Sequence, residues 1–322
     1  MDIKMPRCSY GCSDGCVERC TYARLDGYTA SHPDARAYDH PADSLDGMTD
    51  GLPAHEETGR AEKGFQVSAK RVAFGSRKGG AGKTSCVLGI AEVLGMQKQR
   101  VLVIDLDSQA NATQAFGVEG EFNAFDVLYS GDQGVLSQAV IDTPWPGVSL
   151  VPASEDLARI DVEQMMAPEM RLRNAAAGDP ALDEYDYILV DCPPNLGKVT
   201  INALAYADYA VPVTEPTAFS IRGASAYIDL VTQVKAMLNP GLKLAGVMIN
   251  AVDNHTSEHA FQVQDIRNAY GDDVFQNVIQ WRTGIQDSQS ANVPLHKVGS
   301  RSAKNAFDAF VSLTQEFTRK VG

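Results

Sequence analysis

A glycine-rich loop between a short apolar run and a helical segment constrains this chain more than any other feature. The apolar run is Val72-Ala73-Phe74, and the loop reads Lys78-Gly79-Gly80-Ala81-Gly82-Lys83-Thr84-Ser85. Strand, glycine loop and helix in this order are the context of a P-loop. Glycines let backbone N–H groups approach phosphate oxygens, and the helix N-terminus adds a partial positive charge. The loop predicts a phosphate site, with Lys83 on the phosphates and the Thr84 hydroxyl on Mg²⁺.

Short apolar runs alternate with helical segments from about residue 70 onward. The predicted strands cover 72–74, 101–104, 148–151, 187–190, 209–213, 244–249 and 274–279, and the helical segments include 84–96 and 220–238. Most of these runs are almost continuously apolar, as in strands that are buried on both faces. The alternation predicts an α/β fold, with a mostly parallel central sheet and helices on both faces.

Residues 1–64 differ in composition from the rest of the chain. They are rich in Gly, Pro, Asp, Ser and His and lack apolar periodicity. Such composition predicts a disordered N-terminal extension ahead of a P-loop domain over residues 65–322. The extension carries four cysteines with three residues between neighbours, namely Cys8, Cys12, Cys16 and Cys20. Four thiolates can hold zinc or an iron–sulfur cluster, so a local metal site and a metal-free leader both stay open.

Charge and hydropathy limit the partners of the chain. Its net charge is −13, which does not favour nucleic acid, although a local basic patch can still bind phosphates. No apolar run approaches the roughly 18 residues that a membrane-spanning helix needs. No signal segment opens the chain. We therefore expect a cytoplasmic protein with reduced cysteines.

Three motifs resemble those of one protein family. Lys78 to Thr84 resembles the deviant Walker A motif of the ParA/MinD ATPases, although Arg77 occupies the position of the first P-loop glycine. Val103-Ile104-Asp105-Leu106-Asp107-Ser108-Gln109-Ala110-Asn111-Ala112-Thr113 resembles the second phosphate-site motif of that family. Ile188-Leu189-Val190-Asp191-Cys192-Pro193-Pro194 resembles its Walker B motif. The resemblance runs from about residue 70 to the C-terminus and is greatest to plasmid and chromosome partition ATPases.

The resemblance implies Mg-dependent hydrolysis of ATP to ADP and phosphate. It implies that Asp191 holds Mg²⁺ through a water, that Asp105 supports the Mg²⁺ shell and that Asp107 orients the attacking water. Lys78 would cross a dimer interface to the ATP of the partner, because Lys83 already occupies the position beside its own phosphates. A polar residue at the position of Asn250 would contact adenine.

The resemblance also implies a role and partners. An ATP-dependent homodimer would bind DNA without sequence preference, associate with the nucleoid, and be stimulated by a centromere-binding ParB-like protein. Candidate DNA-binding residues are Arg282, Lys297, Arg301 and Lys304. The basic turn of the family reads here Gln280-Trp281-Arg282-Thr283, and a second basic position reads Asn254-His255-Thr256. Both matches are partial.

Three alternatives remain beside DNA partition. The first is a ParA-like ATPase that positions a protein cargo. The second, a MinD-like membrane switch, would need an amphipathic C-terminal helix. An apolar stripe does occur there, but we interpret it as the core face of a final helix and expect no membrane partner; the stripe is Phe307, Phe310, Val311, Thr314 and Phe317. The third is an iron–sulfur carrier ATPase, whose C-x-x-C pair is absent because Cys86 and Cys192 are solitary.

Overall fold

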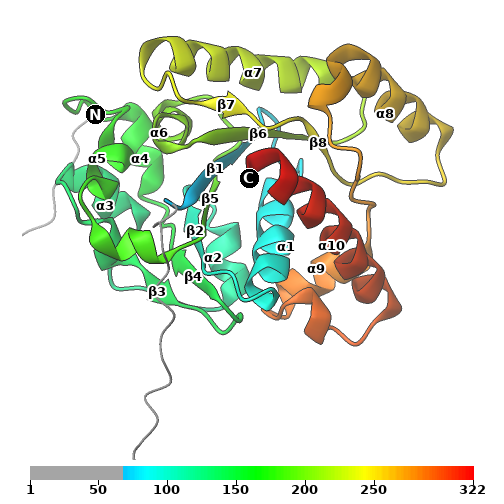
Figure 1. Ribbon diagram of the computed structural model, residues 1–322, viewed down its shortest axis with the longest axis horizontal. Coiled ribbons are helices and arrows are strands. Elements are labelled where there is room, and N and C mark those ends of the chain that lie inside the picture. The colour runs from blue at the N-terminus through cyan, green and yellow to red at the C-terminus, as the bar shows by residue number, and fades with distance from the viewer. Residues whose placement is uncertain (1–67) are drawn as a thin grey trace, which may run out of the picture. The chain divides into compact units, whose positions relative to one another are not determined.

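A mostly parallel sheet runs through residues 68–322, the part of the chain that the computed structural model describes (Figure 1). Its strands are β1 (Lys70–Gly75), β2 (Val101–Asp105), β3 (Ile141–Asp142), β4 (Val148–Val151), β5 (Tyr187–Asp191), β6 (Tyr209–Thr214), β7 (Lys243–Leu244) and β8 (Met248–Ile249). Their order in space is β3-β4-β2-β5-β1-β6-β7, and β8 also pairs with β6. Among these strands, β3 and β4 form the antiparallel pair and the other pairs are parallel.

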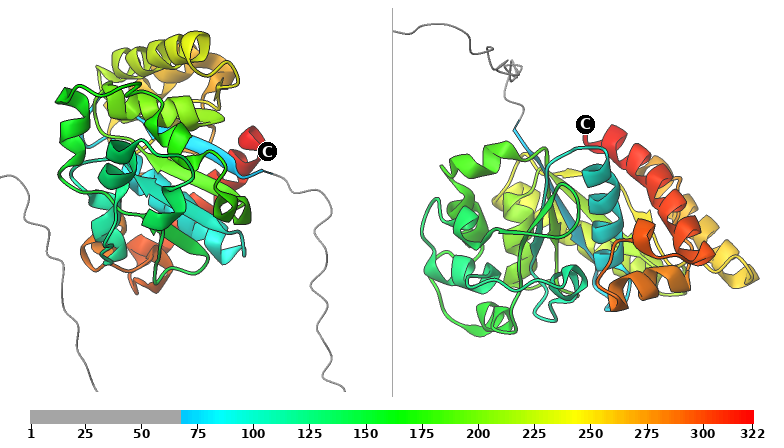
Figure 2. Two further views of the ribbon diagram at one scale, coloured as in Figure 1. Left: turned by 90° about the vertical axis from the view of Figure 1, so that its left-hand side faces the viewer. Right: turned by 90° about the horizontal axis from the view of Figure 1, so that it is seen from below.

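Helices flank the sheet on both faces (Figure 2). They are α1 (Lys83–Met96), α2 (Asn111–Phe116), α3 (Ala124–Ser130), α4 (Leu157–Val162), α5 (Arg171–Ala176), α6 (Lys198–Tyr206), α7 (Ser220–Met237), α8 (Ser257–Tyr270), α9 (Thr283–Ser290) and α10 (Arg301–Val321). Four short 3-10 turns join them: η1 (Leu136–Ala139), η2 (Pro180–Glu184), η3 (Gly271–Asp273) and η4 (Leu295–Lys297). The predicted fold class is confirmed.

The alternation of side chains along each strand fills two separate cores. Val72 and Phe74 pack with α1 and α10, whereas Ala73 packs with α6 and α7 on the opposite face. Successive side chains of a strand point to opposite faces of the sheet. Strands that are covered on both faces must therefore be apolar throughout, which is why the runs in the sequence lack a polar alternation.

Two strand predictions near the C-terminus were wrong. The run 244–249 is broken at Gly246, whose φ of 135° belongs to backbone that side chains rarely adopt, so it forms the separate strands β7 and β8. The segment 274–279 forms no strand. Isolated parallel bridges join Val274 to Val247 and Gln280 to Val252 at its two ends. Between them the Gln276 and Asn277 N–H groups donate to the buried carboxylate of Glu316 on α10 at 2.7 and 2.9 Å. A side chain thus replaces the neighbouring strand as acceptor in the middle of the segment.

The apolar stripe of the last helix belongs to the core, as predicted. Phe310, Thr314 and Phe317 are fully buried, and Phe307 and Val311 are partly buried beside them. The Phe317 ring stacks on Phe74 of β1 with 5.9 Å between ring centroids. In residues 68–322 no helix combines the length and the apolar character that crossing a membrane requires. The four N-terminal cysteines and the boundary between 1–64 and 65–322 lie outside the described residues, so those predictions are untested.

The contact between α1 and α10 yields a test of this packing. A Cβ atom at Gly89 of α1 would lie 2.5 Å from the Phe310 ring. Gly89→Ala should therefore lower the free energy of unfolding by about 1–3 kcal/mol, as overpacking does. Gly223→Ala on α7 is the matched control, because nothing lies within 4 Å of its Cβ position, and it should stabilise by about 0.5–1 kcal/mol. Urea denaturation compares the two variants, and equal stabilisation by both would contradict the α1–α10 contact.

Candidate nucleotide site

The phosphate loop connects β1 to α1 and is closed by a contact from β8. Gly80 and Gly82 have φ values of 79° and 80°. A Cβ atom at Gly82 would lie 1.8 Å from the amide nitrogen of Asn250. That amide nitrogen donates to the Ala81 carbonyl at 3.1 Å. Asn250 therefore fixes the loop from the end of β8, and position 82 must be glycine. The predicted contact of Asn250 with adenine stays a prediction.

Thr84 and Asp191, both predicted at the metal, lie together at the carboxyl edge of the sheet. The Thr84 hydroxyl donates to Asp191 Oδ2 at 2.6 Å. Asp191 Oδ1 is buried and has no hydrogen-bond partner among residues 68–322. Burial, followed by the nearby Asp105 carboxylate, raises the pKa of Asp191 to about 8. A cation next to this orphaned oxygen would favour the ionised form, so the residues fit Mg²⁺.

A Mg²⁺ ion at Thr84 and Asp191 would need few ligands from the protein. Within residues 68–322 no group of three or more His, Cys, Asp or Glu side chains is arranged to hold a metal ion. Mg²⁺ usually keeps several waters and is bound by one or two carboxylates together with phosphate oxygens. The Thr84 hydroxyl as a ligand and Asp191 as the acceptor for a bound water are consistent with such a site.

Asp105 is the last residue of β2, and Asp107 lies two residues further on. The two carboxylates have different surroundings. The Asp105 carboxylate accepts hydrogen bonds from Thr113 N at 2.9 Å, Thr113 Oγ1 at 2.8 Å and Asp107 N at 3.1 Å. These bonds shape the loop between β2 and α2, and the predicted support of the Mg²⁺ shell by Asp105 stays a prediction. Asp107 is 6% exposed and lines the cavity beside Lys83, and its predicted orientation of the attacking water stays a prediction.

Two adjoining cavities surround the loop. The larger, of about 570 Å³, is lined by Asp107, Gln109, Gln289 and the loop itself, namely Gly79, Gly80, Gly82, Lys83, Thr84 and Ser85. The smaller, of about 200 Å³, shares part of the loop and adds Asn250, Trp281 and Arg282. The Gln289 amide donates to Ser85 Oγ at 3.1 Å. Sequence reasoning missed Gln289, because it lies in no motif, and it did not place Trp281 beside the phosphate loop.

Lys78 contacts a residue that no motif predicted. Its Nζ atom lies 2.5 Å from Oε2 of Glu215, the residue after β6. The Lys78 side chain is 56% exposed, so the ion pair is worth about 0–1 kcal/mol. Lys78 is therefore held at Glu215 by a contact that breaks at little cost.

The four basic candidates gather around α9, η4 and the start of α10, which pack against one another. The hydroxyl groups of Thr283 and Ser302 lie 3.2 Å apart, next in sequence to Arg282 and Arg301. Lys297, Arg301 and Lys304 are exposed. Arg282 is half-buried, donates to Gln280 and lines the smaller cavity beside the phosphate loop. Binding of DNA by these residues stays a prediction.

Strand, glycine loop, helix and carboxylates at the carboxyl edge of a parallel sheet define a P-loop ATPase site. A family model described as an AAA domain matches residues 69–244. The chromosome partitioning protein ParA of Caulobacter vibrioides is 31% identical over 70% of this chain and 85% of its own length. The partitioning ATPase Soj of Thermus thermophilus is 32% identical over 70% of this chain and 87% of its own length.

A solved structure adds a further likeness. Cobyrinic acid a,c-diamide synthase from Mycobacterium smegmatis, with bound ADP and magnesium, is 26% identical over 73% of this chain and 98% of its own length, with a TM-score of 0.60. The chain belongs to the ParA-type family of P-loop ATPases. The prediction of ATP and Mg²⁺ as its cofactors is confirmed.

The raised pKa of Asp191 predicts how the nucleotide-free protein responds to pH. In the folded chain the carboxyl group stays protonated up to a pH of about 8, whereas in the unfolded chain it ionises near a pH of roughly 4. Folding therefore takes up a proton between these values, and stability is lost as the pH rises through about 8. Burial raises the pKa of Asp105 to about 6 in the same direction.

Asp191→Asn isolates the contribution of Asp191. Denaturation in EDTA, without nucleotide, should show wild-type stability falling between about pH 6 and pH 8. The variant should lose less over this interval, because its amide does not titrate. Identical slopes for the two proteins would contradict the raised pKa.

Proposed function

We propose that this ParA-like ATPase is a dimerising switch for DNA partition, whose hydrolysis of ATP to ADP and phosphate is stimulated by a centromere-binding partner protein. The observation that carries the proposal is the position of Lys78. Its ammonium group lies on the phosphate loop, yet it is paired with Glu215 and not buried beside Lys83. Lys83 already serves the ATP of its own subunit, so the second lysine of the loop, Lys78, would bind the ATP of another subunit.

The adjoining cavities suggest how ATP would lie. In our proposal the phosphates occupy the larger cavity at Lys83 and Thr84, and the base reaches the smaller cavity between Asn250 and Trp281. Lys78 exchanges Glu215 for the phosphates of the second subunit. ATP bound between two subunits stabilises the dimer by mass action, and hydrolysis ends that stabilisation.

Asp107→Ala tests the order of these steps. The variant should bind ATP and dimerise, because Lys83 and Thr84 remain, but its hydrolysis should fall about 100-fold or more with the loss of the water-orienting carboxylate. Light scattering with ATP gives the mass, and phosphate release gives the rate. Glu155→Ala, an exposed carboxylate after β4, is the control and should hydrolyse at the parental rate. A variant at position 107 that is monomeric, or as fast as the parent, contradicts the role.

The DNA part of the proposal depends on the exposed basic residues at the start of α10. Arg301 and Lys304 are three residues apart, so they share one face of the helix. Residues 68–322 offer neither of them an ion-pair partner. Dimerisation would bring a second copy of Arg301 and Lys304 to the DNA, so even an acidic chain would gain contacts with DNA phosphates. Arg282 lines the smaller cavity beside the phosphate loop. Its substitution could change nucleotide binding as well as DNA binding, so it is not used in the test.

A salt titration on random duplex DNA tests this part. The ATP-bound protein should bind unrelated sequences equally, and ADP should release them. Arg301→Ala and Lys304→Ala should each flatten the log–log salt slope by about 0.9 for every phosphate that the removed side chain neutralised, with hydrolysis unchanged. Lys235→Ala, exposed on α7, should leave the slope unchanged. Equal binding of DNA with ATP and with ADP, or no binding with ATP at low salt, would contradict the DNA-binding role. It would favour an ATPase that positions a protein cargo.

A further inference from the structure

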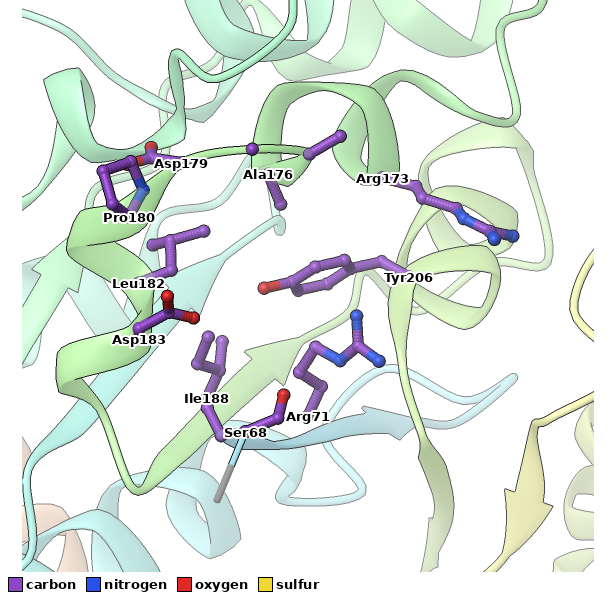
Figure 3. Close-up of a pocket in the computed structure, with 13 residues that line it drawn as sticks. Ser68, Arg71, Arg173, Ala176, Asp179, Pro180, Leu182, Asp183, Ile188 and Tyr206 are labelled. Atoms are coloured by element: carbon purple, nitrogen blue, oxygen red, sulfur yellow. The ribbon is translucent and has the colours of Figure 1, made fainter. Parts of the chain in front are cut away.

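A third cavity, of about 390 Å³, opens at the edge of the sheet opposite to the phosphate loop (Figure 3). It lies at the amino ends of β1 and β5, between the end of α5, η2 and the end of α6. β1 begins beside this cavity and ends at the phosphate loop, six residues later, a distance of about 17 Å along a strand. The nucleotide site therefore does not include it.

One polar group that faces this cavity has no partner among the described residues. Tyr206, at the end of α6, is 3% exposed, and Figure 3 shows its hydroxyl pointing into the cavity. No residue of the described part of the chain hydrogen-bonds to that hydroxyl. The Tyr side chain is thus buried except at its hydroxyl, which is open to the cavity. A ligand with a hydrogen-bonding group can meet the hydroxyl there, as the polar ends of buried Tyr side chains usually find a partner.

The charged neighbours decide which ligand fits. The Arg71 guanidinium lies 5.1 Å from the centre of the Tyr206 ring and is neutralised by Asp208, with 3.0 Å between Nε and Oδ2. The Asp179 carboxylate already accepts from Ser137 N at 2.8 Å and Ala181 N at 3.2 Å. Asp183 differs from both, because no group in residues 68–322 pairs with its carboxylate, which points into the cavity in Figure 3.

The cavity thus offers a free carboxylate and a hydroxyl acceptor above an apolar floor. Leu182 and Ile188 are buried and form part of this floor. Its volume lies within the range of small-molecule sites. We propose that this cavity binds a small aliphatic amine, whose ammonium group pairs with Asp183 and donates to Tyr206 while its carbon chain covers Leu182 and Ile188. The proposal is independent of DNA partition and of nucleotide binding.

Three probes of equal length separate charge from apolar contact. n-Butylamine, 1-butanol and butyrate are titrated against the full chain at neutral pH, with binding followed by ligand-observed NMR. Butylamine should saturate and bind at least tenfold more tightly than butanol, and butyrate should not bind. Equal binding of butylamine and butanol, or no saturation by butylamine, would overturn the proposal.

Two variants and a control locate the site. Tyr206→Phe removes one oxygen that has no protein partner, so the stability should be unchanged while butylamine binding weakens about tenfold. Asp183→Asn should weaken it at least fivefold and leave butanol binding unchanged. Asp132→Asn, an exposed carboxylate after α3, should have no effect. Unchanged butylamine affinity in Tyr206→Phe would sink the assignment.

Discussion

The pairing of β5 with both β1 and β2 is the constraint on which the nucleotide site depends. In the register of these strands Asp191 lies opposite Phe74 on one side and Asp105 on the other. Parallel strands end at a common edge, so the loop after β1, the Walker B carboxylate and the loop after β2 must meet there. A slip of one residue would turn Asp191 to the other face of the sheet.

The same burial sets the electrostatics of the site. Asp191 and Asp105 are fully buried, and burial raises the pKa of both carboxyl groups. The Asp105 carboxylate raises the pKa of Asp191 further, so a second charge beside it in this buried site is unfavourable. Lys83 opposes this effect at Asp191, and a divalent cation would do so more strongly. The site is therefore prepared for a cation and an anion together, as a metal–nucleotide complex supplies them.

The sequence predicts most of the fold and the phosphate site, and it fails where a long-range contact decides. The strands 101–104 and 187–190 and the helix 84–96 are each close to the observed elements because local apolar patterns specify them. The segment 274–279 does not form a continuous strand because the N–H groups of Gln276 and Asn277 are satisfied by Glu316, forty residues from Gln276 along the chain. Glu215 and Gln289 were missed for the same reason, since their contacts with Lys78 and Ser85 span 137 and 204 residues. No local pattern could report them.

The packing of α10 against α1 and β1 bears on how the protein is made. α10 is the last element of the described part, whereas β1 and α1 are its first elements. Until α10 has left the ribosome, the face of α1 around Gly89 and the ring of Phe74 have no apolar cover. During synthesis these surfaces stay open to chaperones and to other nascent chains. The support that α10 gives to α1 therefore forms only after all the other described elements have been synthesised, and removal of α10 would leave the phosphate loop on a helix with one face uncovered.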